Sequence, residues 1–174
     1  MSPQSEHQPV RRLIESGFAD DTGAADPGLV AALASYAAEP ARSAEVLGVL
    51  GQARLLVPVV AVLGEVEYDD AGLAHDKSSD MAAVLLQGND GRMALLAFTG
   101  TESLARWNPD ARPVPVTAQL AAQAAIQDQA AALVIDLAGP TTFVVEGEDL
   151  HGLASGWSLA RVGGRVAWIR PTPQ

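Results

Sequence analysis

The hydrophobic positions of the chain fall into short runs that predict buried strands. The longest is a β-branched run over Arg54–Leu63, and a second run covers Leu133–Leu137. Continuous apolar runs of this kind fit strands that are buried on both faces. Pro58 removes one backbone donor from the first run, so we expect this strand to lie at a sheet edge or to carry a bulge.

Two pairs of apolar segments predict β-hairpins. Residues 81–87 and 92–99 flank Gly88-Asn-Asp-Gly91, a turn composition that tolerates positive φ angles. Near the C-terminus, residues 157–162 and 165–169 flank two consecutive glycines. The first pair gives the more specific signal, because Asn, Asp and Gly together favour tight hairpin turns.

Apolar residues at helical spacing predict helices between these strands. Asp26 can cap free N–H groups and Pro27 suits a first turn, which predicts a helix start before Leu29, Val30, Leu33 and Tyr36. Pro40 ends this helix. Further helices are expected over residues 41–50, 99–107, 118–131 and 146–155, and Thr117 can cap the helix over 118–131. Thr99 and Glu102 have the spacing of a capping box at the start of the 99–107 helix.

The order of these elements predicts an α+β fold, or an α/β fold with a mixed sheet. We expect a central mixed β-sheet with two hairpins and with helices packed on it. The strand–helix–extended–helix–strand order over 92–137 can supply one right-handed crossover between parallel strands. Residues 1–27 are polar and rich in Gly and Pro, which predicts a flexible N-terminal leader before a single domain over 28–174.

Composition and charge narrow the classes of function. The chain has 174 residues, 48% of them hydrophobic, and no cysteine, which excludes a disordered chain, disulfides and thiol chemistry. The net charge is −10, with Lys77 as the single lysine and arginines that are scattered, so we expect neither nucleic-acid nor membrane binding. The longest apolar run is too short for a membrane helix and the N-terminus lacks a signal sequence, so we expect a cytoplasmic protein. The acidity favours solubility, and recognition of a basic partner is the alternative.

Familiar catalytic and ligand-binding motifs are missing from the sequence. It has no G-x-S-x-G segment, no glycine-rich phosphate loop and no paired-histidine motif. Residues 64–80 are the most charged stretch, and we interpret them as a surface loop with weak divalent-cation binding as the less favoured alternative. We therefore expect no catalytic residues, no metal site and no cofactor.

Asp136 is the one acid within an apolar strand, and two interpretations of it stay open. A buried carboxylate at the carboxyl end of a strand can form part of a ligand pocket, together with Thr99 and Thr101 at the end of another strand. The favoured alternative is that its carboxylate accepts N–H bonds from the turn Leu137–Gly139.

A second candidate site is a protein-interaction surface at the start of the 99–107 helix. Its residues are Thr99, Thr101, Glu102 and Trp107, together with the acidic segment 64–80. Tryptophan is enriched in interface anchors, although packing in the core or at its rim is the more common role for a Trp at a helix end.

The order of several motifs resembles the N-terminal domain of the SseB family, the enhanced serine sensitivity proteins, in its actinobacterial form. The resemblance covers about residues 28–155, and its motifs are Leu56–Val59, Lys77–Ala82, Gly88–Thr99, Glu102–Trp107 and Ala132–Pro140. It implies an intracellular bacterial α/β domain whose molecular function is largely unassigned, and it transfers no catalytic residue.

These observations lead to a ranked set of functional hypotheses. The first is a non-catalytic protein-interaction or regulatory module with an unidentified protein partner. The alternative is a small-metabolite binding domain, with an amino-acid-like ligand suggested by the family resemblance and a pocket at Asp136, Thr99 and Thr101. An enzyme ranks last, and a homodimer is a further possibility because a hairpin edge can pair with a second copy.

Overall fold

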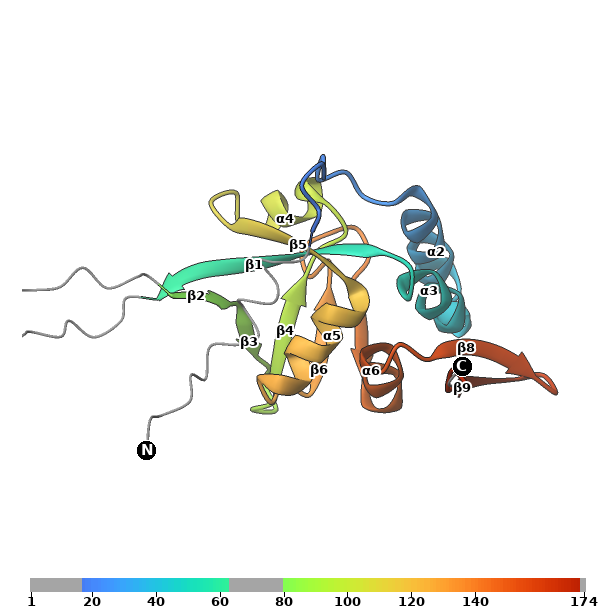
Figure 1. Cartoon of the computed structure of the whole chain (residues 1–174). Coiled ribbons are helices and arrows are strands. Elements are labelled where there is room, and N and C mark those ends of the chain that lie inside the picture. The colour runs from blue at the N-terminus through green and yellow to red at the C-terminus, as the bar shows by residue number, and fades with distance from the viewer. Residues whose placement is uncertain (1–16, 63–79, 173–174) are drawn as a thin grey trace, which may run out of the picture.

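The computed structural model describes residues 17–62 and 80–172, and its longest strand crosses the molecule as the centre of a small antiparallel sheet. This strand is β1 (Arg54–Val62), and it pairs with β2 (Asp80–Ala83) on one side and β5 (Arg112–Thr117) on the other. Figure 1 shows β1 running across the ends of the strands of a second sheet.

The second sheet has four strands in the order β3-β4-β6-β7. Strand β4 (Met93–Ala97) runs parallel to β6 (Ala132–Ile135), whereas β3 (Leu85–Gln87) and β7 (Phe143–Glu146) pair antiparallel at the two edges. The sheet is therefore mixed, and the prediction of an α+β fold with a mixed sheet is confirmed. The predicted crossover between parallel strands joins β4 to β6.

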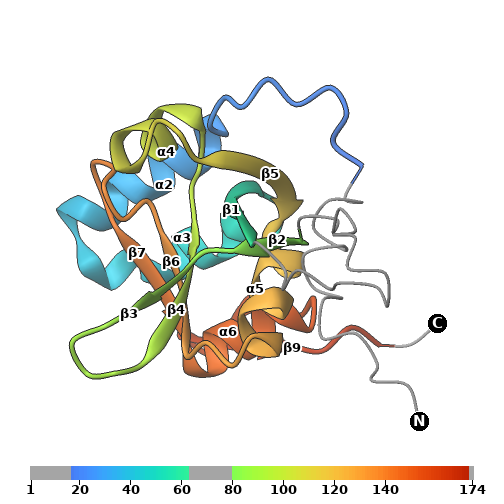
Figure 2. The same cartoon turned by 90° about the vertical axis from the view of Figure 1, so that its left-hand side faces the viewer.

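Five α-helices pack around the sheets in the described part of the chain. Figures 1 and 2 place α5 and α6 along the four-stranded sheet, α2 and α3 beside each other, and α4 near the end of β4. Their bounds are α2 Pro27–Ala38, α3 Ser43–Leu50, α4 Thr101–Trp107, α5 Ala118–Gln127 and α6 Gly147–Ala154, with a 3-10 turn over Pro40–Arg42.

Two of the expected helix caps are confirmed. The Asp26 carboxylate accepts a hydrogen bond from the Leu29 N–H at 2.8 Å, and the Thr117 hydroxyl oxygen accepts one from the Leu120 N–H at 3.1 Å. Both interactions satisfy donors that the first helical turn leaves free. These caps fix where α2 and α5 begin, and α2 forms one wall of the candidate site.

The expected capping box of Thr99 and Glu102 is wrong. The N-cap of α4 is Gly100, and the Ser103 hydroxyl donates to the Gly100 carbonyl at 3.0 Å. Thr99 instead donates its hydroxyl to Asp136, and Glu102 forms an ion pair with Arg106. Asp136, which lies 37 residues away in sequence, thus binds the Thr99 hydroxyl that local spacing had assigned to the helix cap.

Pro58 lies in the interior of its sheet, so the expected edge position is wrong. The register with β5 continues through Pro58, which is paired with Pro113, and shows no bulge. The N–H and C=O of Leu56 both bond Phe98 and therefore point away from β5. Backbone groups two residues apart point to the same side of a strand, so those of Pro58 also point away from β5. The N–H group that Pro58 lacks would therefore lie on the side where β1 changes its partner, from Phe98 after β4 to strand β2.

Both predicted hairpins are confirmed, and the first has an additional bend. Residues 81–87 divide at Val84 into β2, which pairs with β1, and β3, which pairs with β4. The second hairpin consists of β8 (Ser158–Val162) and β9 (Arg165–Ile169), and it forms a separate two-stranded sheet.

The buried side chains form two clusters on opposite faces of the four-stranded sheet. The larger cluster joins α2, α3, α5 and α6 to the sheets and includes Leu29, Leu50, Leu95 and Leu133. The smaller cluster joins α4 to the other face and contains Leu56, Leu96, Phe98, Leu104 and Val134. Alternating positions along β4 supply both clusters, as expected for a strand covered on both faces.

The expected N-terminal leader is described only from Gly17 onward. Residues 17–26 lie along the end of β1 and the start of α4, and helix α2 begins at Pro27. Residues 1–16 and most of the acidic segment 64–80 lie outside the described residues. Among the helices of residues 17–62 and 80–172, none is both long and apolar enough to cross a bilayer.

Candidate functional site

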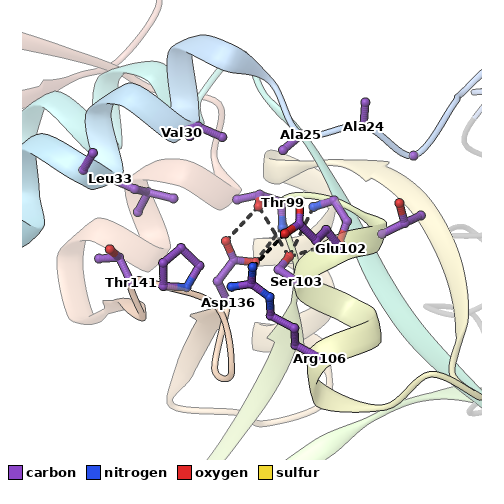
Figure 3. A pocket seen from close by; sticks show the side chains of 15 residues that line it. Ala24, Ala25, Val30, Leu33, Thr99, Glu102, Ser103, Arg106, Asp136 and Thr141 are labelled. Carbon is purple, nitrogen blue, oxygen red and sulfur yellow. Dashed lines mark hydrogen bonds and ion pairs between the residues drawn. The ribbon is translucent and has the colours of Figure 1, made fainter.

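A cavity opens between α2, α4 and the loop that joins β6 to β7, and we call it the α2–α4 cavity (Figure 3). Its volume is about 410 Å³, which lies within the range of about 300–1,000 Å³ that is typical of small-molecule sites. Its walls come from four parts of the chain: Gly23–Ala25; Val30, Leu33 and Ala34 on α2; Thr99–Ser103 with Arg106; and Asp136 with Pro140 and Thr141.

The floor of the cavity is a buried pair of residues, Asp136 and Thr99. One carboxylate oxygen of Asp136 accepts the Thr99 N–H at 2.8 Å, and the other accepts the Thr99 hydroxyl at 2.7 Å. Asp136 is 3% exposed and Thr99 4% exposed. Together with Ser103, they are the buried polar residues of the described chain.

The parallel pairing of β4 and β6 brings this pair together. The two strands end side by side, and the Asp136 N–H continues the ladder by bonding the Ala97 carbonyl at 3.0 Å. Asp136 then turns the chain with a φ of 54°, in the left-handed region, where Asp is one of the few tolerated residues. This turn directs the chain away from the sheet at the point where Thr99 leaves β4.

The favoured interpretation of the Asp136 carboxylate is wrong. The N–H of Gly139 bonds the Asp136 main-chain carbonyl at 3.0 Å, and the Thr142 hydroxyl donates to the same oxygen at 3.1 Å. The turn therefore uses the backbone of Asp136 and leaves its side chain to Thr99.

Helix α4 supplies the polar rim. Thr101 and Glu102 are exposed at its first turn, and the Glu102 carboxylate accepts from the Arg106 guanidinium at 2.7 Å. The buried Ser103 hydroxyl lies 3.5 Å from the Thr99 hydroxyl and links the rim to the floor. Figure 3 shows the Glu102–Arg106 pair beside Asp136.

Arg54 holds one wall of the cavity in place. Its guanidinium pairs with the Asp21 carboxylate at 2.5 Å and donates to the carbonyls of Ala24 and Thr99, the latter at 2.9 Å. The arginine thereby ties the segment before α2 to the end of β4. The Arg54 and Asp21 side chains are 15% and 11% exposed, so this ion pair is largely shielded from water.

Gly100 allows the same wall to approach α4 closely. A Cβ atom at Gly100 would lie 2.8 Å from the Ala25 backbone nitrogen, which is too close for a real contact. The approach is needed because the Thr101 N–H donates to the Gly23 carbonyl at 2.8 Å. The first free donor of α4 is thus satisfied by the segment before α2.

The opposite wall is apolar and comes from α2. Leu33 is buried, whereas Val30 and Ala34 are exposed beside the cavity, and Val30 is 48% exposed. Val30 was grouped by helical spacing with Leu29 and Leu33, and the structure places it at the cavity, whereas Leu29 lies in the core.

Trp107 lies apart from the α2–α4 cavity. Its ring packs against Phe98 with the ring centres 5.5 Å apart, and it borders the smaller buried cluster. The structure therefore groups the residues of the two predicted sites in another way. Thr99, Thr101, Glu102 and Asp136 line one cavity, and Trp107 packs on the other side of α4.

The ionisable side chains of the cavity fall into two separate hydrogen-bonded groups, Asp136 with Thr99 and Glu102 with Arg106. Both oxygens of Asp136 accept from Thr99, and no hydrogen bond joins Asp136 to Glu102 or Arg106 in the described structure. No three His, Asp or Glu side chains converge on a possible metal position within residues 17–62 and 80–172.

Altered pKa values occur outside the cavity. Burial raises the pKa of the Asp128 carboxyl at the end of α5. In the first hairpin turn, hydrogen bonds from Arg92 lower the pKa of Asp90. Neither residue lines the α2–α4 cavity.

Comparison with known families gives a match for most of the chain. The family model described as the SseB protein N-terminal domain matches residues 29–152. The chain belongs to the SseB N-terminal domain family. No curated protein and no solved structure matches the chain. The matched residues of the SseB domain include the cavity from Val30 onward, whereas the β8–β9 hairpin lies beyond them.

Several residues of the site were not expected from the sequence. Arg54, Gly100, Ser103 and Arg106 had no assigned role, and Gly23–Ala25 belonged to the expected leader. The one available signal was Arg54, a charged residue at the start of an otherwise apolar strand. Its partners could not be named because they lie 30 and 45 residues away in sequence.

Proposed function

We propose that this SseB domain is a non-catalytic binding domain for a small molecule and that the α2–α4 cavity is the binding site. The observation that carries the proposal is the convergence of Asp136, Thr99 and Thr101 on one cavity with an apolar wall. Sites for small molecules combine apolar walls with a few fixed polar groups, because the walls supply affinity and the polar groups supply orientation. The Asp136–Thr99 hydrogen bonds fix two such groups before any ligand arrives.

A thermal-shift screen of a metabolite library tests the proposal. A ligand at about 100 times its Kd is expected to add about 2.7 kcal/mol to the free energy of unfolding. The screen uses the wild-type chain and two matched variants. Ala34→Phe places a ring in the cavity, whereas Ala31→Phe places the same ring on an exposed part of α2 that does not line it.

The expected result is a stabilising ligand whose effect is lost in Ala34→Phe and kept in Ala31→Phe. A library without any stabilising member would overturn the proposal. So would a ligand that stabilises all three proteins equally, because its site would lie elsewhere.

Protein interaction remains a second candidate, favoured by the position of Val30. This side chain is 48% exposed and lines the same cavity as the charged groups of Glu102 and Arg106, and the net charge of −10 suits a basic partner. A basic partner recognised there would be released by Val30→Lys, which adds a repelling charge, and by Ala34→Phe, and it would be retained by Ala31→Phe. Retention of that partner by Val30→Lys would count against the interface.

A further inference from the structure

The Asp136 carboxylate is buried without a cationic partner in the described structure. It is 3% exposed, and its hydrogen bonds come from two neutral donors of Thr99. No Arg, Lys or His of residues 17–62 and 80–172 forms an ion pair with it. An ionised carboxylate away from water is unfavourable unless opposite charge or further hydrogen bonds compensate it.

The carboxylate retains capacity for a donor that approaches from the cavity. Its two oxygens offer about four acceptor positions, and Thr99 occupies one on each oxygen. The hydroxyls of Thr101, Ser103 and Thr141 line the same cavity and can each accept a hydrogen bond. A group with several N–H donors and a positive charge would match this arrangement.

The charge of the lining also favours a cation. Three ionisable side chains line the cavity, and Arg106 is already paired with Glu102 at 2.7 Å. With Arg106 paired in this way, Asp136 has no opposite charge among the lining side chains. Because Arg106 is neutralised by its neighbour on α4, the cavity presents one uncompensated negative charge to a ligand.

The apolar wall sets the rest of the ligand. Val30, Leu33 and Pro140 line the cavity with aliphatic side chains, and the volume of about 410 Å³ limits the ligand to a small molecule. We propose that the α2–α4 cavity recognises a primary ammonium group on a short aliphatic stem, with the ammonium on Asp136 and the stem against α2. This inference rests on the proposed function, because it names the ligand class of the same cavity.

Three probes of equal chain length test the inference on the whole chain. They are n-butylammonium, 1-butanol and n-butyrate, which carry positive, zero and negative charge at pH 7. Their binding is measured by titration with protein-detected NMR, which resolves weak ligands, and the amides of Thr99, Thr101 and Ser103 report on the cavity. We expect n-butylammonium to bind about tenfold or more tightly than 1-butanol, because hydrogen bonds to charged groups exceed neutral ones.

Asp136→Asn is the matched variant. The amide oxygen can still accept the Thr99 N–H, the amide nitrogen can donate to the Thr99 hydroxyl, and Asn tolerates the φ of 54°. The variant is expected to keep the amide spectrum of the fold and the binding of 1-butanol, and to lose the preference for n-butylammonium.

The outcomes separate this inference from the proposed function. Equal binding of n-butylammonium and 1-butanol by the wild type, or a preference for n-butyrate, overturns the ammonium assignment and leaves a small-molecule site. An ammonium preference that persists in Asp136→Asn also overturns it. If Asp136→Asn fails to fold, the wild-type charge preference and its loss in Ala34→Phe decide the matter.

Discussion

The residues at the end of β4 and β6 show how one side chain can serve two neighbours. The backbone carbonyl of Asp136 closes its own turn, while its carboxylate fixes Thr99 on the adjacent strand. Thr99 is thereby unable to cap α4, and Ser103 and Gly100 take over the start of that helix. The cavity floor is formed by the resulting hydrogen bonds between Asp136 and Thr99.

Asp128 gives a prediction at the residue scale. Burial raises its pKa in the folded state, so the folded state binds its proton more readily than the unfolded state, whose pKa is about 3.9. Stability therefore falls as pH rises through this range, and the penalty is fully present above the folded-state pKa. We expect Asp128→Asn to be more stable than the wild type at pH 7 by a few tenths of a kcal/mol, because the side chain is only partly buried.

Urea denaturation at a series of pH values measures this effect. The advantage of Asp128→Asn should shrink as pH falls and vanish below about pH 3, where the wild-type carboxyl is protonated in both the folded and the unfolded state. A stability difference that does not change with pH would show that the substitution acts through something other than the charge.

At the scale of elements, the α2–α4 cavity depends on how the segment before α2 is attached. Arg54 on β1, Gly23 and Gly100 hold this segment against α4 through an ion pair, a backbone hydrogen bond and a close approach. None of these contacts is a hydrogen bond within a helix or between paired strands. The wall of the site is thus positioned by long-range polar contacts and by the absence of a Cβ atom.

We expect Arg54→Ala to release this segment from the body of the domain. Breaking a buried ion pair by removing one partner costs about 3–5 kcal/mol, and partial exposure of this pair lowers our expectation to about 2–3 kcal/mol. Arg54→Lys is the matched control, since it keeps the charge but has a single nitrogen in place of the three that contact Thr99, Ala24 and Asp21.

Hydrogen exchange reports on this attachment directly. The Thr101 amide, which bonds the Gly23 carbonyl, should lose protection in Arg54→Ala while the amides of β4 and β6 keep theirs. Arg54→Lys should give an intermediate loss. An unchanged Thr101 exchange rate in Arg54→Ala would contradict the role assigned to Arg54.

At the scale of the whole molecule, the β8–β9 hairpin lies outside the matched family domain. It lies beyond residue 152, where the family match ends, and Figure 1 shows it beside α3 at the end of the molecule away from α4. Trp168 attaches it to α6, with its ring directly on Gly152 and its indole N–H donated to the Asp149 carboxylate at 2.8 Å. A two-stranded hairpin is marginally stable alone, so this attachment decides whether it forms.

Trp168→Ala should therefore unfold the hairpin and leave the rest of the domain intact. We expect a loss of about 2–3 kcal/mol in the free energy of unfolding, below the cost of deleting a fully buried Trp, because Trp168 is partly exposed. Hydrogen exchange should show lost protection in β8 and β9 alone. Asp149→Asn, which keeps an acceptor oxygen, should have a small effect, and loss of protection in β6 would show that the hairpin supports the entire fold.

The sequence by itself determined the features that depend on neighbouring residues. The Gly88–Gly91 turn, the caps at Asp26 and Thr117, and the apolar strands on both sides of that turn were all predictable. These features follow from local backbone sterics and from donors only two or three residues away. The mixed sheet was also predictable, because the order of strands and helices limits the possible pairings.

Only the tertiary structure decided how the site is assembled. The Asp136 carboxylate bonds Thr99 rather than its own turn, Arg54 joins the segment before α2 to the end of β4, and Pro58 lies inside a sheet. Each outcome depends on which distant groups the fold brings within hydrogen-bond distance. The spacing of residues along the chain does not contain this information. The residues of the cavity could therefore be nominated from the sequence, but their partners could not.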